Sequence, residues 1–174
     1  SFVEQQDIIN LVEGLLVETF KEANVDVKGP FLQMTYKEAM ERFGSDKPDT
    51  RFGLELFDVT DIMLASTFEA FKAVIADGGT VRAIRIPGVA NYSRKDIDKL
   101  QELAKKHHAK GLAWLKFNEN ALNGPIAKFI DDKTSELLKN KLSLENNDLI
   151  LFVADKWDVA CNSLSALRAH LAIN

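Results

Sequence analysis

Short apolar runs typical of β-strands alternate with helix-period segments after residue 50, and this alternation constrains the fold more than any other feature. Residues 80–86 alternate with period two and residues 148–154 form a compact apolar run, so both are predicted to be strands. A helix is predicted to begin after the N-cap Ser93 and to end before Gly111. Residues 112–117 are apolar and aromatic, which predicts a further strand.

The other segments after residue 50 are less regular. Residues 67–75 are predicted to be a strand that forms a hairpin with residues 80–86 across Gly78-Gly79. Residues 118–124 are predicted to be a mobile polar loop, and residues 129–139 to be helical. A last helix carries apolar residues at core-facing intervals from Trp157 onward. The predicted order is therefore two strands, a helix, two extended segments or strands, and a helix.

The first 50 residues indicate two helices and a polar boundary. Apolar residues recur at helical spacing between residues 3 and 22, which predicts an amphipathic helix. A second, short helix after Thr35 is predicted to end at Gly44 and to bury one face, formed by Tyr36, Ala39, Met40 and Phe43. Residues 45–49 are polar, turn-forming and rich in charge, so they mark the best domain boundary in the chain.

Charge and cysteine content exclude several classes of protein. With 22 Lys and Arg against 26 Asp and Glu, the net charge is −4, so the chain lacks the strong positive field of an autonomous nucleic-acid-binding protein. No stretch of the sequence approaches the roughly 18 consecutive apolar residues of a membrane span, so no membrane partner is expected. The only cysteine, Cys161, is predicted to be an inert core residue of the last helix, and a reducing compartment such as the cytoplasm fits best.

One local cationic surface is a candidate for contact with nucleic acid. Four lysines fall near one face of the helix that follows Ser93, namely Lys95, Lys99, Lys106 and Lys110. They could follow a line of phosphates, although Asp98 and Glu102 interrupt the positive field. The alternative is an ordinary solvated helix face. The sequence has no glycine-rich phosphate loop and no zinc-ligand spacing, so neither a cofactor nor a metal site is predicted for these residues.

The most specific segment runs from Met34 to Arg51, where a Tyr-x-x-Ala helix leads into Gly-Ser-Asp-Lys-Pro-Asp-x-Arg. This segment resembles the signature stretch of bacterial aspartyl-tRNA synthetases. The likeness continues through Ala-Ile-Arg-Ile-Pro-Gly at 83–88, Ser-Arg-Lys at 93–95, Ala-Lys-Gly-Leu-Ala-Trp at 109–114, Pro-Ile-Ala-Lys-Phe at 125–129, Phe-Val-Ala-Asp at 152–155 and Ala-Leu-Arg at 166–168. Residues 1–3 and the helix after them resemble the family's segment just after class II motif 2. The resemblance therefore covers essentially the whole chain.

The resemblance implies a division of the chain and a fold. Residues 1–50 would be a segment of the class II catalytic domain, and residues 51–174 would be the insertion module called the GAD domain. The fold implied for the insert is α+β, a two-layer sandwich of order β-β-α-β-β-α with helices on one face of an antiparallel sheet, preceded here by a helical flanking segment. The order of strands and helices predicted from the residues agrees with it.

The resemblance also implies an activity for the longer protein, the ATP- and Mg²⁺-dependent ligation of aspartate to tRNA in the cytoplasm. The family's ATP and aspartate contacts, including the arginines of motifs 2 and 3, have no matching residues in this sequence. We therefore expect this fragment alone to be inactive and without a cofactor, because catalytic groups act only when they are held together. The family is homodimeric, whereas the fragment is expected to be a monomer whose natural partner is the rest of the catalytic domain.

Two functions of different classes remain for the insert. It is either an accessory module that contacts the acceptor arm of tRNA weakly through the four lysines, or a structural or protein-interaction module without direct tRNA contact, which the net charge of −4 favours. Five residues at the boundary are expected to order it near the active site and the acceptor end of tRNA, namely Ser45, Asp46, Lys47, Asp49 and Arg51. A capped polar turn with ion pairs accounts for these five residues equally well.

Overall fold

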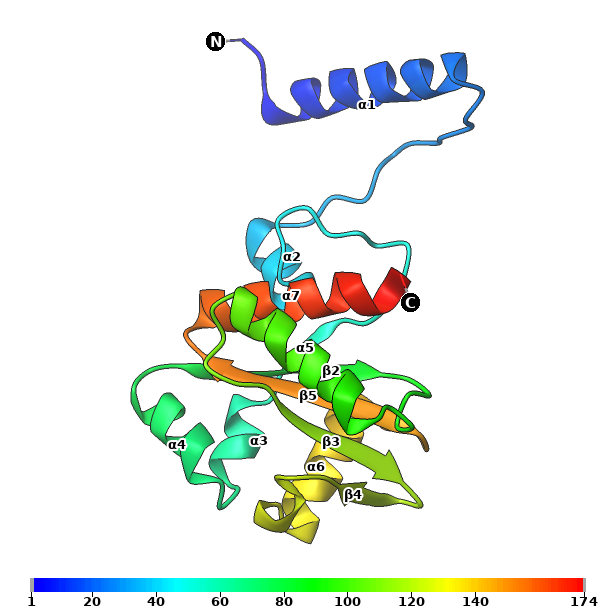
Figure 1. Cartoon of the computed structure of the whole chain (residues 1–174). Helices are drawn as coiled ribbons and strands as arrows, with labels where there is room; N and C mark the ends of the chain where they lie inside the picture. The colour runs from blue at the N-terminus through cyan, green and yellow to red at the C-terminus, as the bar shows by residue number, and fades with distance from the viewer. Residues whose placement is uncertain (1, 174) are drawn as a thin grey trace. The chain divides into compact units, whose positions relative to one another are not determined.

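The chain divides into two compact units, Ser1–Thr35 and Tyr36–Asn174. The structure is a computed structural model that describes residues 2–173, except the side chain of residue 173. The first unit contains helix α1 (Gln5–Glu22), which confirms the amphipathic helix predicted there (Figure 1). At its start the backbone N–H of Glu4 donates to the Asp7 carboxylate at 2.9 Å. The Phe31 N–H donates to Glu13 at 2.8 Å, so the segment after α1 is held against it.

A five-stranded antiparallel sheet forms the centre of the second unit. Its strands in spatial order are β1 (Leu56–Asp58), β2 (Thr80–Ile86), β5 (Asp148–Asp155), β3 (Ala113–Asn118) and β4 (Ala121–Asn123). The two long strands β2 and β5 pair along their whole length, from Thr80 opposite Asp155 to Ile86 opposite Leu149. The strands predicted at residues 80–86, 112–117 and 148–154 are thereby confirmed within a residue or two.

Helices cover both faces of this sheet (Figure 1). One face packs against α5 (Arg94–Lys106) and α7 (Trp157–Ile173), and the other packs against α3 (Thr60–Leu64), α4 (Glu69–Ala76) and α6 (Asp132–Leu142). Successive residues of a strand point to opposite faces, so Ile84 joins the first core and Ala83 the second. The α+β class and the antiparallel sheet are confirmed. The described helices are distributed over two faces, however, whereas the sequence interpretation placed them on one.

Within residues 67–75 the chain is helical from Glu69 onward, as part of α4, so the strand predicted there is wrong. Their apolar residues Phe68, Phe71 and Ile75 also fit helical spacing, and they pack into the core beneath the sheet. The hairpin expected across Gly78-Gly79 is wrong for the same reason, because the segment before these glycines is a helix. The strand β2 pairs instead with β1 and β5.

The polar segment at residues 118–124 contains the short strand β4 rather than a loop alone. Glu119 and Asn120 have φ values of 51° and 61°, the left-handed conformation that a tight hairpin turn requires at both central positions. They bring Ala121 opposite Asn118, where β4 begins to pair with β3. A 3-10 helix, η1 (Ala127–Phe129), then leads toward α6.

Local signals placed the helices α2 and α5 correctly. The Ser93 hydroxyl accepts a hydrogen bond from the Asp96 N–H at 3.3 Å, and the Asp96 carboxylate accepts one from the Ser93 N–H at 3.1 Å, which is the expected start of α5. The helix α2 (Tyr36–Phe43) buries Ala39, Met40 and Phe43 as predicted. Tyr36 was misassigned to that face, since it is 65% exposed. None of the helices described within residues 2–173 is long and apolar enough to cross a membrane.

Candidate functional site: the junction segment and the lysine face

The junction segment, residues 45–55, begins with a tightly hydrogen-bonded polar turn. The Lys47 N–H donates to the Ser45 hydroxyl at 3.1 Å. The Arg51 guanidinium donates to both oxygens of the Asp49 carboxylate, at 2.9 Å from Nε and 2.5 Å from Nη2. These hydrogen bonds lower the pKa of Asp49 from 3.8 to about 2. Asp46 lies exposed on the same turn, so all five predicted junction residues gather there, and their role in tRNA binding stays a prediction.

A buried arginine from the last helix anchors the second half of the junction segment. Arg168 on α7 is only 3% exposed, and its guanidinium donates to the carbonyl oxygens of Asp49, Phe52, Gly53 and Leu54 at 2.6–3.2 Å. Desolvation by burial lowers the pKa of this guanidinium. The guanidinium carbon also lies 4.3 Å from the centre of the Phe52 ring. In the sequence, Arg168 stands out only as part of the Ala-Leu-Arg motif at 166–168, and no local pattern predicts its hydrogen-bond partners.

The helix α2 is tied to the junction segment by a second arginine. Arg42 donates to both oxygens of Glu55, at 2.7 and 3.0 Å, and to Glu38 at 2.8 Å. The hydrogen bond from Arg42 lowers the pKa of Glu55. At the end of α2, Gly44 has a φ of 68°, and a Cβ there would lie 2.2 Å from the carbonyl oxygen of Cys161 on α7. The junction segment is therefore bound to both α2 and α7 within the second unit.

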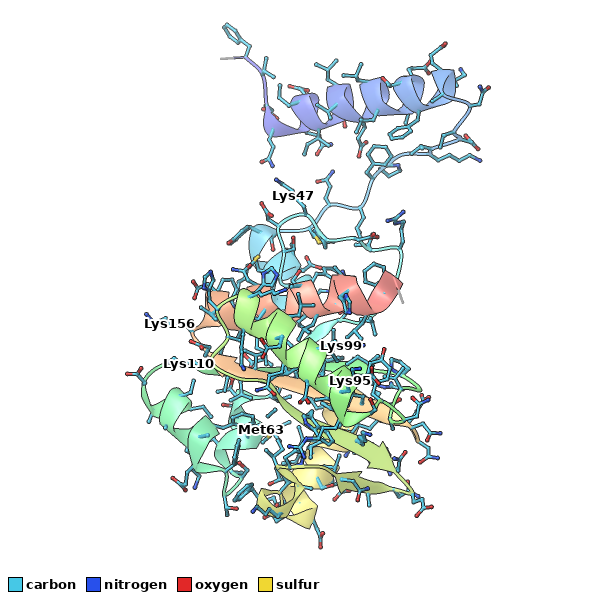
Figure 2. The ribbon with its side chains drawn as sticks, viewed as in Figure 1. Lys47, Met63, Lys95, Lys99, Lys110 and Lys156 are labelled. Atoms are coloured by element: carbon cyan, nitrogen blue, oxygen red, sulfur yellow. The ribbon has the colours of Figure 1, made fainter. Side chains whose placement is uncertain are left out.

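The lysine face, which consists of Lys95, Lys99, Lys106 and Lys110, is exposed but not continuous. Figure 2 labels Lys95, Lys99 and Lys110. Lys95, Lys99 and Lys106 lie on α5 within about 40° of one another around its axis, given 100° per residue. Lys99 lies 3.6 Å from Asp96, an ion pair that reduces the local positive charge. Lys110 lies beyond the end of α5, toward the opposite end of the helix from Lys95 and Lys99. Contact between the lysine face and nucleic acid likewise stays a prediction.

The thiol of Cys161 and the possible metal-ligating side chains are the remaining candidates for chemistry. Cys161 is fully buried on α7, and burial raises the pKa of its thiol to about 11, so it is the unreactive core residue that was predicted. Within residues 2–173, no group of three or more His, Cys, Asp or Glu side chains could hold a metal ion.

Comparison with known families defines the class of this protein. The family described as the GAD domain matches residues 71–164, more than half of the chain and the span from α4 into α7, so the chain belongs to the GAD domain family. Over 173 residues it is 50% identical to an aspartate–tRNA ligase of Clostridium botulinum (strain Kyoto / Type A2). The aligned region covers 99% of this chain and 29% of that protein. It is 49% identical over 173 residues to an aspartate–tRNA ligase of Geobacillus kaustophilus (strain HTA426), with 98% of this chain and 29% of that protein covered.

The resemblance to bacterial aspartyl-tRNA synthetases is thereby confirmed over almost the whole chain. The chain spans 29% of the length of these relatives.

Proposed function

We propose that this chain is part of an aspartate–tRNA ligase and that its GAD domain is an accessory module that contacts the acceptor arm of tRNA through the lysine face. Similarity to aspartate–tRNA ligases from two bacterial genera supports the first part. The single observation that carries the second part is the exposure of four lysines on and just beyond α5. We expect weak binding, because the lysine face is small and interrupted and the net charge is −4.

The longer protein would be a class II ligase that joins L-aspartate to tRNA with ATP and Mg²⁺ in the cytoplasm. We expect the chain by itself to be inactive in this reaction, because it spans 29% of its relatives' length and a reaction centre works only when its groups are held together. The side-chain clusters of residues 2–173 do not fit a metal ion, so no step of the reaction is assigned to them.

The helix α1 supports a partnership with the rest of a catalytic domain. Its apolar side chains are 37–70% exposed, and they are Ile8, Leu11, Val12, Leu15, Leu16 and Phe20. Burying each of these large side chains would contribute about 1.5–3 kcal/mol, so an unpaired stripe of this kind favours packing against another surface. The proposed partner is the remainder of the longer protein. We expect the longer protein to be a homodimer and this chain to be monomeric.

The second candidate function is a structural or protein-interaction module that makes no direct contact with tRNA. The net charge of −4 favours this alternative. The two functions differ in one measurable quantity, the affinity of the chain for tRNA.

The test is fluorescence anisotropy of labelled tRNA for aspartate, titrated with the chain at about 50 and 200 mM salt. If the four lysines neutralise about four phosphates, binding should weaken about a hundredfold between these salt concentrations. A variant with all four lysines changed to Glu should lose binding. The matched control changes four exposed lysines elsewhere to Glu, which gives the same change in net charge, at Lys21, Lys28, Lys133 and Lys141.

Loss of binding in the first variant but not in the control would support the lysine face as the contact surface. Equal loss in both variants would indicate a nonspecific effect of net charge and would count against the lysine face. No binding by the unmodified chain even at low salt would leave the structural module as the better account.

A further inference from the structure

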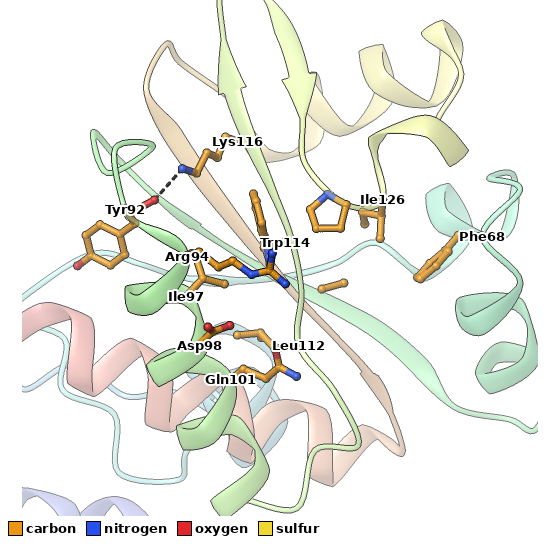
Figure 3. A pocket seen from close by; sticks show the side chains of 12 residues that line it. Phe68, Tyr92, Arg94, Ile97, Asp98, Gln101, Leu112, Trp114, Lys116 and Ile126 are labelled. Carbon is orange, nitrogen blue, oxygen red and sulfur yellow. Dashed lines mark hydrogen bonds between the residues drawn. The ribbon is translucent and has the colours of Figure 1, made fainter.

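A pocket of about 700 Å³ lies between α5 and β3 in the second unit (Figure 3). Its polar and aromatic lining comes from Tyr92, Arg94, Asp98, Gln101, Trp114 and Lys116. Its apolar floor is formed by buried side chains that include Ile97, Leu112 and Ile126. Binding sites for small organic ligands typically have volumes of about 300–1,000 Å³, so the pocket is large enough to hold one.

The strand β3 places an aromatic ring and a cation side by side in the pocket. Trp114 and Lys116 are two residues apart and therefore point to the same face of the sheet. Lys116 Nζ lies 5.7 Å from the centre of the Trp114 ring and donates to the Tyr92 carbonyl at 2.7 Å. Gly124 has a φ of 142°, and a Cβ there would lie 3.2 Å from Trp114 Cζ3, so the backbone after β4 packs closely against the ring. The ring is thus held from one side, and Trp114 is half-buried in the lining of the pocket.

The first residue of α5 supplies a second cation. Figure 3 shows the Arg94 side chain extending from α5 toward Trp114. Within residues 2–173 the Arg94 side chain has no hydrogen-bond or ion-pair partner, and the hydrogen bond from Lys116 goes to a neutral carbonyl oxygen. Asp98 is the acidic side chain of the lining. The pocket therefore combines an aromatic surface with two cations whose charge is only partly balanced.

We propose that this pocket binds one unpaired nucleotide of an RNA strand, with its base stacked on Trp114 and its phosphate held by Arg94 and Lys116. Base stacking on an aromatic side chain, together with nearby cations, is the usual way in which proteins hold single-stranded nucleic acid. Asp98 argues against a simple anion, because its carboxylate repels a bare phosphate but accepts a hydrogen bond from a base amino group. The pocket should therefore prefer a base that carries an exocyclic amino group. This inference deepens the proposed function, on which it rests for the identity of the RNA.

The test uses the fluorescence of Trp114 itself. The chain contains two tryptophans, so Trp157→Phe leaves Trp114 as the single emitter in the full chain. The probes are hexacytidylate and hexauridylate, which differ in having an amino group or a carbonyl oxygen at position 4 of the base. We expect saturable quenching of Trp114 by hexacytidylate at low salt, about tenfold weaker binding of hexauridylate, and no quenching by inorganic phosphate.

Variants separate the pocket from general electrostatics. Arg94→Ala should weaken binding of hexacytidylate about tenfold, as expected for loss of a charge-assisted phosphate contact. The matched control is Lys105→Ala, because Lys105 is exposed on the same helix, lies outside the pocket and the lysine face, and pairs with Glu102. Its binding should change less than about threefold. Trp114→Leu should weaken binding of labelled hexacytidylate measured by anisotropy, and Trp114→Phe, which keeps a ring, should restore part of it.

Several results would overturn the proposal. Absence of quenching by hexacytidylate, equal quenching by phosphate alone, or equal losses in the Arg94 and Lys105 variants would each do so. Equal binding of the two hexanucleotides would overturn the amino-group preference assigned to Asp98.

Parallel measurements distinguish failure of this inference from failure of the proposed function. If tRNA binding depends on the lysine face but hexacytidylate does not quench Trp114, the pocket proposal fails and the tRNA contact stands. If hexacytidylate quenches Trp114 but reversal of the four lysines leaves tRNA binding unchanged, the pocket stands and the lysine face fails.

Discussion

Replacement of Arg168 by Met should loosen the junction segment and destabilise the second unit. The native Arg168 is 3% exposed, and its guanidinium donates to four carbonyl oxygens between residues 49 and 54. Methionine keeps much of the apolar stem but removes every donor. The carbonyl oxygens then depend on water or on a rearranged backbone for their hydrogen bonds.

The expected loss in the free energy of unfolding is about 2–4 kcal/mol. Each hydrogen bond to a charged group contributes about 1.5–3 kcal/mol, which would give a larger total for the four bonds. Two effects reduce this total. First, burial of the charged guanidinium has a desolvation cost, which also lowers the pKa of Arg168. Second, much of the junction segment is exposed enough for water to reach its carbonyl oxygens. For a unit of this size the melting temperature should fall by about 5–15 °C.

Urea unfolding followed by circular dichroism gives the free energies, and Arg51→Met is the matched control. Arg51 is also an arginine of the junction region, but its side chain is 88% exposed and its ion pair is with Asp49 alone. Its replacement should leave the urea concentration at the midpoint of unfolding nearly unchanged. Arg168→Lys should give an intermediate loss, because an ammonium group keeps the charge but cannot reach the same set of carbonyls.

Limited trypsin digestion provides an independent readout of the same anchor. Cleavage after Arg51, which is exposed within the anchored stretch and is followed by Phe52, should be faster in Arg168→Met than in the unmodified chain. Unfolding of Arg168→Met at the same urea concentration as the unmodified chain, together with an unchanged cleavage rate, would refute the anchoring role.

Three further predictions concern the same region. Gly44→Ala should cost more than about 2 kcal/mol in urea unfolding, because its φ is 68° and a Cβ would strike the Cys161 carbonyl, whereas Gly53→Ala, with open space around it, should cost less than about 1 kcal/mol. Cys161 should react with a thiol reagent only after unfolding, since burial raises its pKa to about 11; fast reaction of the folded chain would contradict this. The pair Asp49–Arg51 should stabilise the fold above pH 3.8 and lose this effect as the pH falls toward 2, and carboxyl NMR should find a higher Asp49 pKa in Arg51→Met than in the unmodified chain.

Features that depend on neighbouring residues could be predicted from the sequence. The start of α5 follows from Ser93 and Asp96, whose side chains and backbones satisfy one another over three residues. The strand β5 follows from an apolar run too short for a helix. The segment at 67–75 was mispredicted because a short apolar run fits both periods, and packing of Phe71 beneath the sheet decides between them.

The anchored junction and the pocket could not be predicted in this way, because their partners are far apart in the sequence. Arg168 lies more than a hundred residues from the carbonyl oxygens that it binds, and no spacing rule connects them. Arg94 and Trp114 come together only because α5 packs across the sheet beside β3. The lysine face, by contrast, was visible in the sequence, since helical spacing alone places its first three members on one side of α5.

The helix α5 connects the two proposed RNA contacts, and its geometry limits how they can be used together. Arg94 and Lys95 are consecutive, so their side chains leave the helix about 100° apart, one toward the pocket and the other toward the lysine face. A single strand that reached both would have to pass the start of α5, where the Asp96 carboxylate caps the helix and also pairs with Lys99. That carboxylate repels phosphates. The arrangement therefore favours a duplex segment along the lysine face with an unpaired nucleotide turning into the pocket, rather than one continuous single strand across both surfaces.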